Sequence, residues 1–181
     1  AWRLAAMALL ALAVADTGGR IARRVRTTHP EDYEWTACMR VVRQYTTPNE
    51  HVFFWGFTPD CYVHVRRLPA TRFVYTTFLT GLIPWANIDP LIDTKAIVTP
   101  GSWDQLQEDF RRNPPAMIIG TGSVREQNKY PLHDQPLLWS LITRDFAEVN
   151  VFTGGFRDFR FYRRLDPVVA RPLPAEAVAD A

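Results

Sequence analysis

Two carboxylates in a long proline-containing segment are the best candidates for acid–base chemistry in this chain. Asp89 and Asp93 flank Pro90, and a positioned carboxylate is a usual base for an acceptor hydroxyl in group transfer. Two acids four residues apart in a loop are also what a solvated turn contains, and the turn is the commoner case. We take Asp89 and the nearby Trp85 as candidate substrate-binding residues, because aromatic side chains suit carbohydrate or interfacial contact.

Three arginines bracket a second candidate site. Arg66 and Arg67 end a short predicted helix, and Arg72 precedes a predicted strand. Guanidinium groups gathered at such a turn can hold a phosphate or an acidic glycan bidentately. Salt bridges to acids on the surface of the domain itself are the competing interpretation and the commoner arrangement.

Other catalytic constellations are missing from the sequence. The four histidines are scattered, with no H-x-x-x-H pair or matching acid for zinc, and no G-x-S-x-G motif marks a serine nucleophile. Gly120–Ser123 follows a predicted strand, but it lacks the third glycine of a dinucleotide fingerprint and the lysine of a P-loop. The sequence therefore predicts no metal and no cofactor in this segment, and a plain turn at Gly120–Ser123. Cys38 and Cys61 are predicted to be free thiols, and a disulfide between them stays open.

Hydrophobic periodicity predicts the elements that must position these residues. The predicted helices are Pro30–Thr47, Pro59–Arg67, Ser102–Arg112 and Pro136–Phe146, and the predicted strands are Val52–Trp55, Phe73–Tyr75, Ala116–Ile119 and the hairpin Val149–Phe152 with Phe159–Tyr162. Thr80–Gly101 is an apolar loop, which we expect to be either a lid on the domain or a segment resting on a membrane or a partner. The element order predicts an α/β three-layer α/β/α sandwich, with a mostly parallel sheet and the last strand antiparallel at an edge.

The first 26 residues combine an apolar run with a basic cluster. Leu4–Ala15 is uninterrupted in its apolar character but shorter than the span of about 20 residues that a bilayer needs. We expect it to be the end of a transmembrane helix or an interfacial helix, with a signal peptide or a soluble helix as alternatives. The cluster, expected to anchor the chain at lipid phosphates, is Arg20, Arg23, Arg24 and Arg26. We expect residues 27–165 to form a soluble α/β domain and residues 166–181, which are rich in Pro and Ala, to form a tail.

Bulk composition is that of one globular domain with a sizeable core. The chain has 181 residues, of which 47% are hydrophobic and 22% charged, with a formal net charge of +2. A chain of this length buries about 70% of its unfolded surface. No basic stripe at helical spacing follows the first 26 residues, so we predict no nucleic-acid partner.

One stretch carries a resemblance to a known family. VFFWGFTPDCYVHVRRLPATRFVYTTFLTG, from Val52 to Gly81, combines a strand, W-G-F-x-P-(D/E)-x-Y, a basic pair and P-A-T-R-(F/Y)-x-Y. It resembles the C-terminal soluble domain of bacterial polytopic membrane glycosyltransferases of the GT-C type, which are related to protein mannosyltransferases and aminoarabinose transferases. With Trp103–Pro115 and Phe161–Arg164, which fit the same pattern, the resemblance covers Tyr33–Arg164. These motifs mark an accessory domain of that family and not its catalytic machinery.

The resemblance implies a supporting role for this chain in a larger enzyme. The whole protein would be an integral membrane glycosyltransferase that uses a polyprenyl-phosphate sugar donor. This chain would be its extracytoplasmic (periplasmic) domain, non-catalytic by itself, with membrane lipid, the transmembrane part of the protein, and the donor or a glycan acceptor as its partners. The basic cluster alone would favour the cytoplasmic side. The alternatives are an exported carbohydrate- or partner-binding module without a membrane body, and a small Rossmann-like enzyme that uses the Gly120–Ser123 turn.

Overall fold

The computed structural model describes residues 30–86, 89, 91–123, 129–154 and 157–165. The chain divides into two compact units, Ala1–Thr36 and Ala37–Ala181. Of the first unit the structure describes residues 30–36, which begin helix α2, and the remaining elements belong to the second unit. The predicted membrane segment, with its four arginines, and the predicted tail lie outside the described residues and stay predictions.

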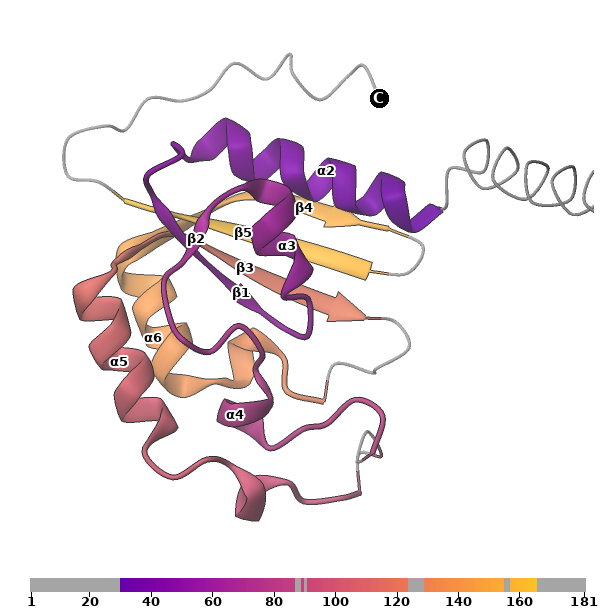
Figure 1. The fold of residues 1–181 in the computed structure, drawn as a ribbon, viewed down its shortest axis with the longest axis vertical. Coiled ribbons are helices and arrows are strands. Elements are labelled where there is room, and N and C mark those ends of the chain that lie inside the picture. Colours follow the sequence, from indigo (N-terminus) through magenta and orange to yellow (C-terminus); the bar gives the residue numbers. More distant parts are fainter. Residues whose placement is uncertain (1–29, 87–88, 90, 124–128, 155–156, 166–181) are drawn as a thin grey trace, which may run out of the picture. The chain divides into compact units, whose positions relative to one another are not determined.

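The second unit is an α/β domain (Figure 1). Its described helices are α2 (Pro30–Tyr45, which starts in the first unit), α3 (Asp60–Val65), α4 (Thr77–Thr80), α5 (Ser102–Arg112) and α6 (Pro136–Asp145), with 3-10 turns η1 (Lys95–Ile97) and η2 (Leu132–Asp134). The strands are β1 (His51–Trp55), β2 (Leu68–Pro69), β3 (Pro115–Ser123), β4 (Phe146–Thr153) and β5 (Arg157–Arg164). The four predicted helices and the final hairpin are confirmed.

The sheet is mixed, which corrects the prediction of a mostly parallel sheet. Its strand order is β2-β1-β3-β5-β4, with β1 parallel to β2 and β3, and β5 antiparallel to β3 and β4. The last strand, β5, therefore lies inside the sheet and not at its edge. The reason is visible in the side chains, because β5 carries the fully buried Phe159 and Phe161, whereas β4 is mostly half exposed. A strand inside the sheet is shielded by a neighbour on each side, whereas an edge strand is left more exposed.

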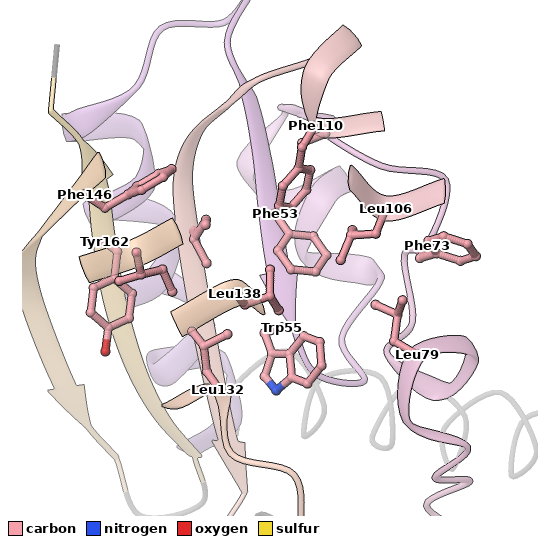
Figure 2. Packing of buried hydrophobic residues seen from close by; sticks show 13 residues of the cluster. Phe53, Trp55, Phe73, Leu79, Leu106, Phe110, Leu132, Leu138, Phe146 and Tyr162 are labelled. Atoms are coloured by element: carbon pink, nitrogen blue, oxygen red, sulfur yellow. The ribbon is translucent and has the colours of Figure 1, made fainter. Parts of the chain in front are cut away.

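Strand β1 is buried on both faces by alternate side chains. On one face the ring of Phe53 packs edge-on against Phe110 of α5, with 5.1 Å between ring centroids, and belongs to the core cluster in Figure 2. On the other face Phe54 packs edge-on against Tyr62 of α3, again at 5.1 Å. A strand with helices against both its faces must be apolar throughout, which accounts for the run Val52–Trp55.

Two local predictions are wrong. Phe73–Tyr75 is not a strand, because the backbone there is held by side chains and by the end of β1: the Phe73 N–H donates to Thr71 Oγ1 and the Thr76 N–H to the Gly56 carbonyl. The parallel partner of β1 is instead the two-residue β2.

Gly120–Ser123 is not a turn either, because it continues β3 and pairs with Arg157–Arg160 of β5. Gly120 lies against Leu132, whose Cδ2 would be 3.2 Å from an added Cβ. The glycine therefore serves close packing, and Gly120–Ser123 forms neither the predicted plain turn nor the phosphate-binding turn of the Rossmann-like alternative. This removes the structural basis of the Rossmann-like alternative.

Tyr62 gives the first testable prediction, because its hydroxyl completes the hydrogen bonding of β1. Strand β2 pairs only with His51 and Val52, and the Phe54 N–H donates to the Tyr62 hydroxyl at 3.0 Å. Replacement of Tyr62 by Phe leaves that buried N–H without an acceptor, at a cost of about 1–3 kcal/mol. Urea unfolding should show this loss. The control Tyr75→Phe, at an exposed tyrosine, should stay within about 0.5 kcal/mol, and an equal effect of the two changes would contradict the assignment.

Candidate functional site

Arg72 forms a salt bridge within the domain, which is the arrangement that competes with anion binding by the three arginines. Its Nη2 lies 2.7 Å from Asp109 Oδ1 and its Nε 2.9 Å from Oδ2. The same Oδ2 accepts hydrogen bonds from the Arg72 N–H and the Thr71 hydroxyl, both at 3.0 Å. The Arg72 guanidinium, helped by these donors, lowers the pKa of Asp109 from 3.8 to about 2. Arg72 thus ties the turn after β2 to α5.

Arg66 and Arg67 point to different surroundings. Arg67 turns back to Thr46, the residue that follows α2: its Nε donates to the Thr46 hydroxyl at 2.9 Å and its Nη2 to the Thr46 carbonyl at 2.7 Å. Burial lowers the pKa of Arg67. Arg66 ends α3 in the left-handed conformation, with φ of 55°, and its side chain is exposed. The structure therefore does not bring the three arginines together into one anion site.

Asp109 gives a pH-dependent prediction. Its folded-state pKa lies below its ordinary value, so its contribution to stability is complete above pH 3.8 and is lost as the pH falls toward about 2. Asp109→Asn should lower the free energy of unfolding by about 1.5–3 kcal/mol at pH 7, and the difference from wild type should shrink between pH 4 and pH 2. Urea unfolding at several pH values measures this. Asp104→Asn, at an exposed acid of the same helix, is the control, and a pH-independent difference for Asp109→Asn would contradict the prediction.

The long loop is tied down at the carboxyl end of the parallel strands. Thr94, which is fully buried, donates its hydroxyl to the Thr80 carbonyl at 2.6 Å and shares a hydrogen bond with the Tyr130 hydroxyl. The carbonyl of Tyr130 accepts a hydrogen bond from the indole of Trp55, the last residue of β1, at 2.9 Å. Trp103 of α5 donates its indole N–H to the Leu79 carbonyl at 3.0 Å. These contacts hold the loop at the carboxyl edge of the parallel strands, where α/β sheets usually bind their ligands.

Lys129 fixes the tip of the loop through backbone carbonyls. Its ammonium group donates to the carbonyl of Asp89 at 2.8 Å and also to that of Ile92. The Asp89 carboxylate accepts from the Leu91 N–H, and the Asp93 carboxylate from the Lys95 N–H, each at 2.9 Å. Both acids thus stabilise local turns with exposed side chains. These contacts agree with the turn interpretation of the pair.

The same segment exposes large apolar side chains. Trp85 is 83% exposed and Leu91 91% exposed. With the other exposed members they form what we call the 78–97 surface: Phe78, Trp85, Leu91, Ile92 and Ile97. Buried residues of the same stretch, Leu79, Leu82 and Thr94, face the domain. The loop is therefore packed by one set of side chains and presents a second apolar set to its surroundings.

The sequence identifies part of this arrangement. Trp85, Leu91 and Ile92 are recognisable as unusual in a loop, and the structure exposes all three. Lys129 and Tyr130 carry no signal in the sequence, because each acts on residues about 40 positions away.

Within the part of the chain that the structure describes, no group of three or more His, Cys, Asp or Glu side chains is arranged to hold a metal ion. In the same residues no helix combines the length and apolar character needed to cross a bilayer. Cys38 and Cys61 are free, buried thiols, and the hydrogen bond between them together with burial raises the pKa of Cys38.

Comparison with known proteins yields no family model, no curated protein and no solved structure that matches this chain. Fold class and site are therefore defined by this chain's own residues: an α/β domain with an anchored, outward-facing apolar loop at the carboxyl edge of its parallel strands.

Gly81 gives a prediction about the anchoring of the loop. It has φ of 70°, and an added Cβ would lie 2.2 Å from the Thr94 carbonyl oxygen. Gly81→Ala must therefore push the Thr94 anchor away. Gly101, with a similar φ of 73° and only Gln105 Nε2 nearby at 4.0 Å, is a matched control for the backbone strain of about 1–2 kcal/mol.

We expect Gly81→Ala to speed limited proteolysis within residues 82–97 and to cost more stability than Gly101→Ala. Equal protease sensitivity of the two variants would show that the Thr94 contact does not hold the loop.

Proposed function

We propose that this chain is the C-terminal extracytoplasmic accessory domain of an integral membrane glycosyltransferase of the GT-C type, which uses a polyprenyl-phosphate sugar donor. The 78–97 surface is the part of the domain that rests on the lipid surface beside the transmembrane body. The observation that carries this proposal is the outward exposure of Trp85 and Leu91 from a loop that is anchored on its other side.

The energetics of the loop support a contact that lies outside the described domain. An apolar side chain of this size gains about 1.5–3 kcal/mol when it leaves water. A lid that closed on its own domain would place Trp85 and Leu91 inward, whereas both are nearly fully exposed. Lys129 and Thr94 hold the loop in this orientation through backbone carbonyls. Exposed apolar groups of this kind are typical of surfaces that meet a membrane or a partner.

The motif that carries the family resemblance supports the same proposal through its roles in the fold. Trp55 and Gly56 close β1 at the edge where the loop is anchored, because Trp55 binds Tyr130 and the Gly56 carbonyl accepts from Thr76. Thr71 and Arg72, from the P-A-T-R part, bind Asp109. The motif residues thus position the 78–97 surface and take no part in chemistry. In this proposal the catalytic acids belong to the membrane part of the protein.

The solvent-facing candidates for substrate contact are Arg66, Trp85 and Asp89.

We also propose that the domain is a three-layer α/β/α sandwich, since β1 packs against α5 on one face and against α3 on the other.

An exported carbohydrate- or partner-binding module is the second candidate function. Trp85 favours it, because an exposed indole is also a stacking platform for a sugar ring.

A fluorescent probe at a single position separates the two candidates. Leu91→Cys and the control Val63→Cys, at a side chain 77% exposed on α3, are labelled with an environment-sensitive fluorophore in the full chain. The native thiols are buried and should not react. Addition of phosphatidylcholine vesicles should shift the emission of the Leu91 probe to shorter wavelength and leave the Val63 probe unchanged.

Quenching by lipids that carry nitroxide groups should follow the same pattern. No response of the Leu91 probe to vesicles, together with a response to oligosaccharides, would overturn the membrane proposal and favour the carbohydrate-binding module.

A further inference from the structure

A cavity of about 420 Å³ lies between α5, α6 and the sheet. It is lined by the starts of β3 and β4 and the end of β5, through Pro115, Phe146 and Arg164. Because β1 and β3 are parallel, this is the amino edge of the sheet, at the opposite end of the strands from the anchors of the 78–97 surface. The cavity is therefore independent of the proposed docking surface.

One part of the cavity lining is apolar. The rings of Phe110 and Phe146 are buried and lie at the same end of the core cluster in Figure 2. Leu137 and Leu141 of α6 are partly buried and complete this lining. A volume of this size is within the usual range of about 300–1,000 Å³ for small-molecule sites.

The charged residues of the cavity are mostly cationic. Arg111, Arg144 and Arg164 line it, and Asp145 is the acid in its lining. Arg144 holds Asp145 with two hydrogen bonds of 2.8 Å. These bonds, with a smaller contribution from the Arg164 charge, lower the pKa of Asp145.

Glu108, just outside the lining, is shared by two arginines. Arg111 Nη1 lies 2.7 Å and Arg112 Nη2 2.8 Å from its carboxylate oxygens. Of the residues that line the cavity, three arginines face one acid, which leaves two net positive charges.

Arg164 is the cation most available to a ligand. Among the described residues its side chain makes no hydrogen bond or salt bridge, and it is half-buried at the end of β5. Its neighbour Arg163, by contrast, points to the other face and binds Glu50 and the Ala116 carbonyl. A guanidinium group with free donors beside an apolar cavity matches an anion that carries an apolar group.

We propose that this cavity binds a small organic phosphate, with its phosphate group on Arg164 and Arg144 and its ring or chain against Phe110, Leu141 and Phe146. The two net positive charges match a phosphate monoester near neutral pH. The chemistry is that of an amphiphilic anion, so that neither the phosphate alone nor the apolar group alone fills the site.

Binding of 1-naphthyl phosphate to the full chain tests this site by isothermal titration calorimetry, with inorganic phosphate and 1-naphthol as separate probes. The phosphate ester should bind at least tenfold more tightly than either part. Arg164→Gln should weaken its binding about tenfold or more. Arg112→Gln is the matched control, since it removes the same charge from an exposed side chain that does not line the cavity, and it should change affinity less than twofold.

Leu141→Trp, which fills the cavity from α6, should abolish binding. Its fold is checked by circular dichroism and urea unfolding, and the pair Arg164→Gln and Arg112→Gln decides the question if this variant does not fold. Equal losses for both arginine variants would mean non-specific attraction to a basic surface and would overturn the site. No binding of the ester, or binding of 1-naphthol as tight as that of the ester, would overturn it as well.

Discussion

The carboxylate of Asp109 is the constraint on which the arrangement of this domain depends. It is buried on α5 and accepts hydrogen bonds from Thr71 and from the backbone and guanidinium of Arg72. A buried carboxylate must be satisfied in this way, so the turn after β2 is held against α5. Residues 73–101 connect these two points. The 78–97 surface therefore belongs to a long connection whose two ends are held together by one charge-assisted contact, that of Asp109 with Thr71 and Arg72.

The apolar loop within this connection has a defined outward face because hydrogen bonds to its backbone carbonyls hold it in place. Thr94 and Lys129 bind carbonyl groups, and Gly81 lets the Thr94 carbonyl approach closely. Anchors of this kind leave the side chains of Trp85 and Leu91 free to meet another surface. The basic cavity lies at the amino edge, between the carboxyl-terminal half of α5, helix α6 and the end of β5. The two ends of the sheet thus offer two different chemistries, one for apolar contact and one for anions.

Elements governed by local periodicity could be predicted from the sequence, and those governed by distant partners could not. Helix α5 and the β4–β5 hairpin follow their hydrophobic patterns. Phe73–Tyr75 has the composition of a strand, but the contacts of Thr71 and Thr76 override it. Gly120–Ser123 has the composition of a turn, yet pairing with β5 makes it the last part of strand β3. For the site, the apolar loop and the salt-bridged state of Arg72 were foreseeable, whereas Asp109, Lys129 and Arg164 gain their roles only through residues remote in sequence.

The reading frame upstream of Ala1 tests the central proposal most directly, because a GT-C accessory domain requires a membrane body on the same polypeptide. Sequencing of the gene should reveal about ten apolar spans of about 20 residues each before Ala1, with acidic residues in the loop after the first span. A start codon within a few residues of Ala1 would contradict the proposal and leave an exported binding module as the function of this domain.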